Sequence, residues 1–186
     1  MCAYSSRPPW RTQRIRTPRA WLFGGLLVGM LWLGAGCAGA RVVQGMYLDS
    51  ENRYQIRLPA APWISISLDG AALSFRQPAL QAAIAFSVEC SSSELGELPW
   101  VARHLFFGLR EKRIQRREQV SLHGAEGVRT WLVAELDGVP VAVEGVTARR
   151  GECLYDFMYV APPAAFARGR SDFQTFVESW SPLAEP

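Results

Sequence analysis

Apolar and polar residues alternate over much of the chain after residue 46, with the two-residue period of β-strands. The alternation is clearest in Arg53–Leu58, and it stops at Pro59. The same period predicts further strands at 63–68, 72–76, 82–90, 114–122, 127–136, 139–148 and 153–160. Hairpin turn signals separate several of them, namely Asp69-Gly70, His123-Gly124 and Asp137-Gly138. The pattern therefore predicts consecutive antiparallel strands.

Two segments have helical spacing instead. Apolar residues recur every three or four positions from Leu98 to Lys112, and a second helix begins at Pro163. The strand Cys153–Val160 is apolar on both faces, which indicates a sheet that is covered on both sides. We therefore predict an α+β fold, with a twisted antiparallel sheet of about six or seven strands flanked by two amphipathic helices.

The N-terminal segment has a different pattern. Residues 1–19 contain five arginines and no acid, and the stretch 20–36 includes the uncharged run Leu22–Leu33. A basic region, an apolar region of this length and small residues after it are typical of a secretory signal peptide. We therefore assign residues 1–36 to a signal peptide, and we expect the rest of the chain to be exported.

Cys37 follows small residues at the end of this apolar region. Leu33-Gly34-Ala35-Gly36-Cys37 resembles the lipobox of bacterial lipoproteins, although Gly34 stands where that family usually has an aliphatic residue. The resemblance implies that Cys37 is acylated and anchors the mature chain to a membrane. The alternative is an uncleaved signal anchor over Ala20–Ala40, which is about long enough to span a bilayer.

Charge is distributed unevenly between these two parts. The whole chain has a net charge of +3, but residues 37–186 contain 15 basic and 17 acidic side chains, a net charge of −2. This balance argues against nucleic-acid binding. We expect a lipidated cysteine and short tether at 37–45, a single exported domain at 46–181 and a tail at 182–186.

Cys90 and Cys153 are the remaining cysteines of the exported part. In an oxidising compartment they can form a disulfide, which would be worth about 4 kcal/mol in the chain-entropy model. The alternative is two separately buried cysteines that act as small apolar residues. The spacing argues against a Cys-x-x-Cys oxidoreductase.

Asp156 lies in the middle of the most apolar strand, on the face of Leu154 and Met158. A buried carboxylate must be paired, hydrogen-bonded or neutralised. One interpretation is an acid that faces a ligand in a cavity. The other, which we favour, is a structural pair with an arginine such as Arg103 or Arg129.

Other polar groups carry weaker signals. His104 is expected on the exposed side of the first helix, and His123 in a turn; neither belongs to a cluster with the spacing of metal ligands. The serines 91–93 lack a nucleophile-elbow context and are expected to form a loop or a helix cap. The basic run of Lys112, Arg113, Arg116 and Arg117 is expected to be a solvated face. We predict no catalytic residues, no metal and no cofactor.

The order of elements resembles the PsbP/DcrB/LpqN-type α/β/α sandwich. The residues that carry this resemblance are the opening Tyr54-x-Ile56-x-Leu58-Pro59 strand, the meander of four strands and the terminal helix ending Phe173-x-x-Phe176-Val177-x-Ser179-Trp180. The resemblance implies an exported or membrane-associated accessory or binding protein without catalysis. It identifies no functional residues.

Two functions remain open. The first is a non-enzymatic accessory module of the cell envelope, anchored through Cys37, that binds an envelope protein. The second is a carrier of a small apolar ligand or lipid between the sheet and the helices. A pocket along the face of Leu154 and Met158 would favour the carrier, whereas an exposed aromatic patch with Phe107 or Trp100 would favour the partner-binding module. We expect the domain to face the periplasm or the exterior. Ala38 follows the cysteine where an aspartate would be the retention signal, and the resemblance to enterobacterial lipoprotein sorting therefore implies the outer rather than the inner membrane.

Overall fold

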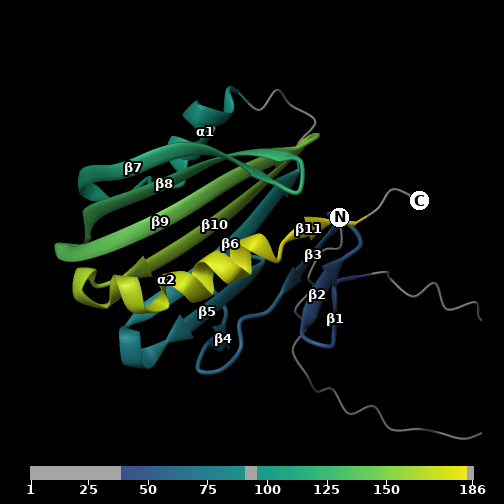
Figure 1. The fold of residues 1–186 in the computed structure, drawn as a ribbon, viewed down its shortest axis with the longest axis horizontal. Helices are drawn as coiled ribbons and strands as arrows, with labels where there is room; N and C mark the ends of the chain where they lie inside the picture. The colour runs from purple at the N-terminus through teal and green to yellow at the C-terminus, as the bar shows by residue number, and fades with distance from the viewer. Residues whose placement is uncertain (1–38, 91–95, 184–186) are drawn as a thin grey trace, which may run out of the picture. The chain divides into compact units, whose positions relative to one another are not determined.

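The computed structural model describes residues 39–90 and 96–183, which belong to a compact unit that is distinct from residues 1–36. Its largest element is a seven-stranded antiparallel sheet in the order β4-β5-β6-β10-β9-β8-β7 (Figure 1). The strands are β4 (Ile64–Ile66), β5 (Leu73–Gln77), β6 (Ala82–Cys90), β7 (Arg110–Leu122), β8 (Ala125–Leu136), β9 (Val139–Arg150) and β10 (Cys153–Ala161). Each had been predicted within a few residues from its alternation.

A second, four-stranded sheet lies at one end of the main sheet (Figure 1). It contains β1 (Arg41–Val43), β2 (Met46–Asp49), β3 (Tyr54–Arg57) and β11 (Ser181–Pro182). Only β3 was predicted from the sequence. β1 falls within the predicted tether, where it pairs with β2 instead of running as free chain.

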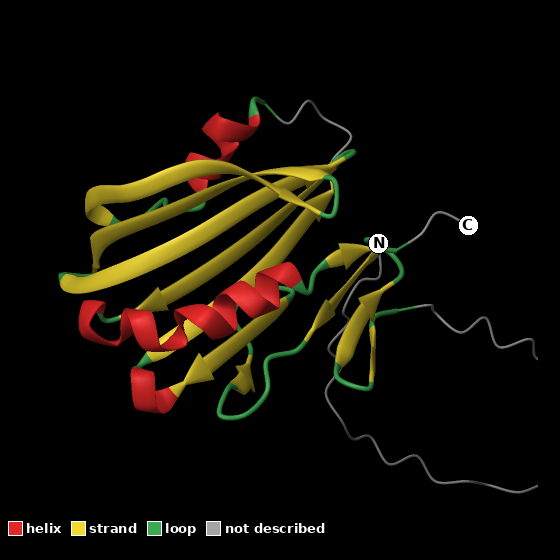
Figure 2. Cartoon of the chain, in the orientation of Figure 1, coloured by secondary structure: helices red, strands yellow, loops and turns green. Residues whose placement is uncertain are grey.

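Helix α2 (Pro163–Glu178) covers one face of the main sheet (Figure 2). Its apolar side carries Phe166, Phe173, Phe176 and Val177, and its phenylalanines pack against aromatic residues of β6 and β10. Tyr159 of β10 donates a hydrogen bond to the carbonyl of Phe166 over 3.0 Å, which ties the first turns of the helix to the sheet. We call this side of the sheet the α2 face.

Helix α1 (Leu98–His104) covers part of the opposite side, the α1 face. The predicted helix to Lys112 was too long. Gly108 has φ +88°, a conformation that favours glycine, and the chain turns there before β7 begins at Arg110. The segment 105–109 turns Phe106 inward against Leu132 and Val143, so tertiary packing replaces the last helical turns.

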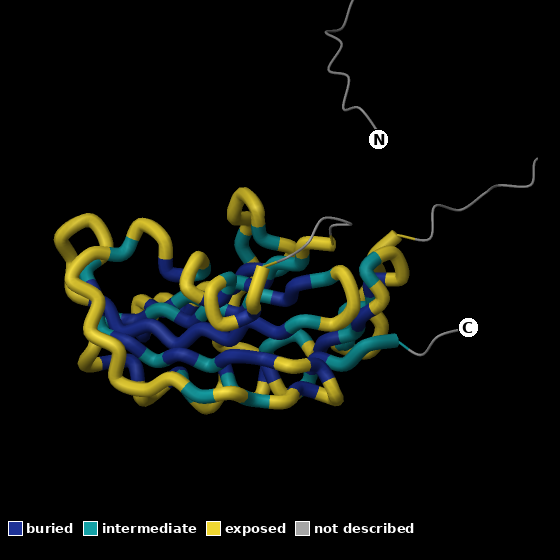
Figure 3. The backbone as a smooth tube through the Cα atoms, turned by 90° about the horizontal axis from the view of Figure 1, so that it is seen from above, coloured by how far each residue is buried: buried dark blue, intermediate teal, exposed yellow. Residues whose placement is uncertain are grey.

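The predicted α+β fold, with a sheet covered on both sides, is confirmed. Buried residues form a layer through the central strands, between the more exposed segments above and below it (Figure 3). Within residues 39–90 and 96–183, the helices are too short or too polar to cross a membrane. The predicted signal peptide, Cys37 and the serines 91–93 lie outside the described residues.

Candidate functional site

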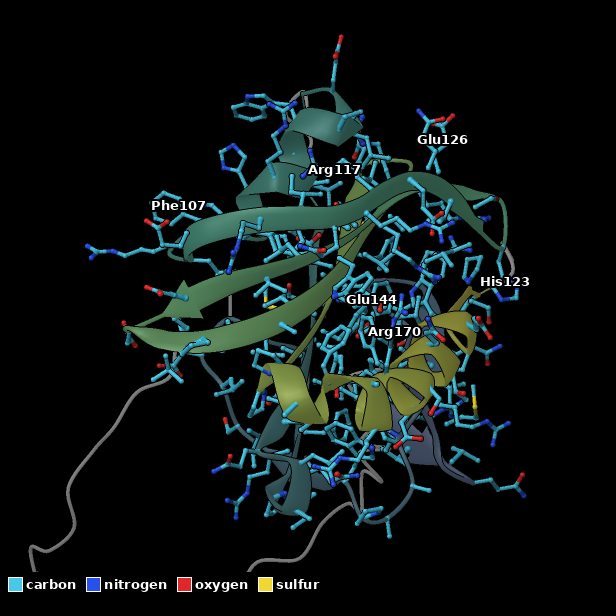
Figure 4. The ribbon with its side chains drawn as sticks, turned by 60° about the vertical axis from the view of Figure 1, so that its left-hand side comes forward. Phe107, Arg117, His123, Glu126, Glu144 and Arg170 are labelled. Carbon is cyan, nitrogen blue, oxygen red and sulfur yellow. A yellow bond between two sulfur atoms is a disulfide. The ribbon has the colours of Figure 1, made fainter. Side chains whose placement is uncertain are left out.

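A cleft of about 450 Å³ opens between α1 and the edge of the main sheet. It is lined by Arg103, Phe106, Lys112, Ile114, Arg117 and Leu132, and we call it the β7 cleft. Three secondary-structure elements contribute to it, because Arg103 belongs to α1, Leu132 to β8 and the residues from Lys112 onward to β7. Figure 4 shows Arg117 between β7 and α1.

The lining combines cations with an apolar floor. Phe106 and Leu132 are buried, whereas the three cationic side chains are exposed. Arg117 donates from Nε to Thr130 Oγ1 over 3.1 Å, and Lys112 donates from Nζ to the Phe106 carbonyl over 3.3 Å. The basic run predicted as a solvated face is indeed exposed, but the strand divides it, because Lys112 and Arg117 line the cleft and Arg116 does not.

The register explains this division. Arg117 stands opposite Thr130, while Arg116 stands opposite Trp131, which packs against the core of the α2 face. Successive residues of a strand point to opposite faces. Arg116 forms an ion pair with Glu118 instead. The register also shifts between Ile114 and Arg116, so Lys112 and Arg117, five positions apart, can both line the cleft, while Arg113 and Arg116 do not.

Large apolar side chains are exposed near this end of the sheet. Phe107 has 90% of its surface accessible, although its neighbour Phe106 is buried. Val139 and Leu136, on the hairpin between β8 and β9, are 60% and 42% accessible. This hairpin lies at the end where β7 begins, because Arg110 pairs with Glu135. We call Phe107, Leu136 and Val139 the apolar end, and Figure 4 shows Phe107 beside the beginning of β7.

Trp100 on α1 is also exposed, at 57%, and its ring lies 4.2 Å from that of His104. The structure thus has exposed aromatic residues at both positions named from the sequence. Leu154 packs with Leu98 and Ala102 of α1, and Met158 packs with the Phe106 cluster. These two side chains therefore belong to the core that the α1 face buries.

The buried acid Glu144 was missed by the sequence analysis. It is fully buried on β9, Arg170 of α2 donates to its Oε2 through Nε over 2.5 Å, and Arg129 Nε lies 3.6 Å from its Oε1. Arg170 also lies over the Trp131 ring, 5.2 Å from its centre. Figure 4 shows Glu144 and Arg170 meeting between the sheet and α2. This cluster fastens the helix to the sheet, so we assign it a structural role.

Asp156 does not form the predicted pair with an arginine. Arg129 pairs with Glu144 on the opposite face of the sheet, and Arg103 lines the β7 cleft. Asp156 instead accepts a hydrogen bond from Thr147 Oγ1 over 2.6 Å. Burial raises the pKa of its carboxyl, the Thr147 hydroxyl lowers it, and the charge of Glu89 raises it. A neutral hydroxyl opposite the carboxylate is explained by the register, which sets Asp156 beside Thr147 on β9 and Ser87 on β6.

Cys90 and Cys153 form a disulfide in the structure. They are directly opposite each other on the central strands β6 and β10. Of the two alternatives left open by the sequence, the structure has the bridge. Disulfides of this kind are typical of proteins outside the cytoplasm.

The two histidines occupy the places expected of them. His104 is exposed on α1, and His123 lies in the turn between β7 and β8 with Nε2 3.2 Å from the carbonyl of Glu178. Strand β7 separates them along the chain, and each has its own local contacts. Neither lines the β7 cleft.

Comparison with known proteins yields a fold but no sequence family. No family model matches the chain, and no curated protein matches it in sequence. Among solved structures, cyanobacterial PsbP (CyanoP) from Synechocystis sp. PCC 6803 is similar with a TM-score of 0.57, at 15% identity over 81% of this chain and 96% of that one.

Two further structures share the fold. LpqN of Mycobacterium tuberculosis has a TM-score of 0.54 at 10% identity, covering 70% of this chain and 83% of its own. PA94 of Pseudomonas aeruginosa has a TM-score of 0.50 at 16% identity, covering 70% and 92%. The PsbP and LpqN parts of the predicted resemblance are therefore confirmed at the level of structure, and this chain has the fold that those two proteins share.

Proposed function

We propose that this chain is an exported, membrane-anchored accessory protein of the cell envelope, without catalytic activity, which binds a partner protein through its apolar end. Cys37 is the proposed site of lipidation. The domain would then face the periplasm or the exterior, held at the membrane by acyl chains.

The exposure of Phe107 carries the proposal of a partner. Burying a phenylalanine side chain contributes about 1.5–3 kcal/mol, and exposed apolar groups that gather on a protein commonly mark binding sites. Phe107 is 90% accessible, and the exposed Val139 and Leu136 lie at the same end of the sheet. Aromatic residues are also enriched at protein interfaces.

The extracytoplasmic location is supported by two further observations. The Cys90–Cys153 disulfide fits an oxidising compartment. The structure of LpqN, which has the same fold, is described as that of a protein involved in cell envelope biogenesis. Both agree with the basic and apolar pattern of residues 1–36.

The partner is tested by affinity capture of the full anchored chain from detergent-solubilised membranes. We compare the wild type with the double variant Phe107→Ser and Val139→Ser, and with the control Leu68→Ser. Leu68 is 44% accessible and precedes the turn between β4 and β5, away from the apolar end. A specific partner should be lost from the double variant and retained by the control. Equal recovery with all three proteins would refute the apolar end as the interface.

The anchor has its own test. Cys37→Ser should abolish acyl labelling and leave an unprocessed precursor in the membrane. Normal maturation of this variant would refute lipidation at Cys37, and the partner proposal would stand or fall separately.

A further inference from the structure

The β7 cleft has a chemical composition that the partner-binding proposal does not use. Three of the six residues that line it are cations, and the other three are apolar. No acid lines it. A lining of this kind is complementary to a molecule with a negative group at one end and an apolar body at the other.

Two of the three cations of the cleft, Arg117 and Lys112, donate to uncharged acceptors. Arg117 donates from Nε to the hydroxyl of Thr130, and Lys112 donates to the carbonyl of Phe106. In the part of the chain that the structure describes, the ion pairs join Arg116 to Glu118 and Glu144 to two other arginines, all outside the cleft. The guanidinium of Arg117 is thus held toward the cleft by a contact that leaves its positive charge uncompensated there.

The floor of the cleft supplies the apolar part of the site. Leu132 and Phe106 are buried, and Ile114 forms a half-exposed wall beside them. These side chains come from β8, the segment after α1 and β7, so they are held by the sheet and not by a loop alone. The cleft volume of about 450 Å³ lies in the range of small-molecule sites, which is about 300–1,000 Å³.

We propose that the β7 cleft binds a single-chain amphiphilic anion, such as an alkyl phosphate or a fatty carboxylate. The alkyl chain lies along the half-exposed Ile114 and over the small accessible areas of Phe106 and Leu132 at the floor. The negative group binds Arg117 and Arg103, whose planar guanidinium groups can each donate two hydrogen bonds to a phosphate or carboxylate. Lys112 adds a third positive charge to the lining. This goes beyond the proposed partner function and does not depend on it.

A cleft favours a monomeric amphiphile over two other anionic ligands, namely a bilayer surface and an acidic peptide. A bilayer surface would meet exposed side chains on a flat or convex patch, whereas Phe106 and Leu132 are buried at the bottom of the cleft. An acidic peptide would need more than one negative group in register with the cations. The competition experiment below distinguishes both of them from an amphiphile.

The experiment uses photolabelling of the full chain, reconstituted in nanodiscs of zwitterionic phosphatidylcholine. The probe is octyl phosphate with a diazirine in its chain, and the matched neutral probe has a hydroxyl in place of the phosphate. Labelled peptides are mapped by mass spectrometry. We expect the anionic probe to label peptides that contain residues 103–117 and 132, and the neutral probe to label them at least tenfold less.

The variants locate the binding groups. The double variant Arg103→Gln and Arg117→Gln should lose at least tenfold of the labelling at these peptides. Arg116→Gln removes the same kind of charge from the same strand, but its side chain is directed away from the cleft, so labelling should stay within twofold of the wild type. Thermal unfolding of each variant establishes that it is folded. If the double variant and Arg116→Gln were labelled to the same extent, the proposal would be overturned.

Competition separates the alternative occupants. Unlabelled octyl phosphate should suppress the labelling, and inorganic phosphate at the same concentration should not. Suppression by inorganic phosphate would mean that the cleft binds a free anion only. Loss of labelling in nanodiscs of phosphatidylglycerol would identify a bilayer headgroup as the occupant, and stronger competition by a Glu-Phe repeat peptide would identify an acidic peptide. Each of these three results would overturn the proposal that the cleft binds an amphiphilic anion.

Discussion

The two faces of the main sheet are covered in different ways. The α2 face lies under a helix of 16 residues, and its core contains most of the buried aromatic side chains. The α1 face has a helix of 7 residues and two smaller apolar clusters, beside which the β7 cleft opens. A closed face contributes stability, and a partly covered face leaves side chains available for binding. The cleft and the apolar end, at which binding is proposed, thus lie on the less fully covered face.

The buried acids show the same contrast. Glu144 on the α2 face lies between two arginines, whereas Asp156 on the α1 face has a threonine hydroxyl. A fully buried carboxylate with cationic partners is an essential part of the packing, because its removal leaves the partners' charges uncompensated. A half-buried carboxyl with a neutral partner tolerates replacement more easily.

The largest expected effect is that of Glu144→Gln. Breaking a buried ion pair by removing one partner costs about 3–5 kcal/mol, and here two arginines lose their counter-charge. We expect urea unfolding to show a decrease of the free energy of unfolding in that range. The double variant with Arg170→Gln should lose less than the sum of the two single changes, because the groups act together. A loss below about 1 kcal/mol would mean that the α2 face does not depend on this cluster.

Substitutions at two glycines test how tightly the elements on each face pack against the main sheet. A Cβ at Gly169 in α2 would lie 2.6 Å from the Tyr159 hydroxyl, and one at Gly145 would lie 2.6 Å from the ring of Phe106. Overpacking costs about 1–3 kcal/mol. Gly169→Ala should cost the larger amount, despite a gain of about 1 kcal/mol in helix propensity, because Tyr159 is fully buried and hydrogen-bonded.

For Gly145→Ala we expect a smaller loss of stability, together with faster amide exchange in 98–109. The segment that carries Leu105 and Phe106 can move outward from the sheet. Differential scanning calorimetry and hydrogen exchange measure both effects. If Gly145→Ala costs as much as Gly169→Ala, the α1 cover is as rigid as α2.

Asp156→Asn should have a pH-dependent effect. Burial raises the pKa of this carboxyl above its ordinary value of 3.8, so the folded state prefers the protonated form. The contribution to stability is complete below pH 3.8 and is lost as the pH rises through the raised pKa. Asparagine carries no charge, so the variant should gain stability relative to the wild type between about pH 4 and pH 7. Paired melting curves across this pH range test it, and a constant difference would argue against the burial of the charge.

The smallest expected effect is that of Phe107→Ser. Substitution of an exposed side chain away from packing contacts usually changes stability by less than about 0.5 kcal/mol. Chemical unfolding should therefore be nearly unchanged, while partner capture is lost. A large destabilisation would show that Phe107 belongs to the cover of the α1 face.

Much of the fold could be predicted from alternation, because strands of nine residues or more carry a clear period. β6 was predicted with the observed bounds, 82–90. β1, β2 and β11, with two to four residues each, were missed. β3 and β4 are just as short, but they were predicted because Pro59 and Asp69-Gly70 mark where their alternation stops. The end of α1 was missed because Phe106 leaves the helical spacing to fill the space beside Leu132.

The sites were harder to predict than the fold. Glu144 lies in an apolar strand, as Asp156 does. The rule that a buried carboxylate needs a partner, applied to β9, would have identified Glu144 as a candidate. Its partner could not be chosen, since Arg129 is local to the neighbouring strand and Arg170 is on α2. The β7 cleft brings together a helix, a turn and two strands, with a bulge near Ile114 that shifts the register. A basic run in a sequence does not show which of its members share a face after such a shift.

The disulfide has a consequence for proteolysis. Cys90 and Cys153 are 63 positions apart, and between them lie α1, β7, β8 and β9, which carry both the cleft and the apolar end. This part of the domain is thus a covalent ring that closes on the central strands. A single cut anywhere in the ring leaves the pieces joined, so a nicked molecule keeps its mass apart from one added water and separates into fragments only after reduction. Proteolysis within the ring therefore does not release the β7 cleft or the apolar end from the rest of the domain.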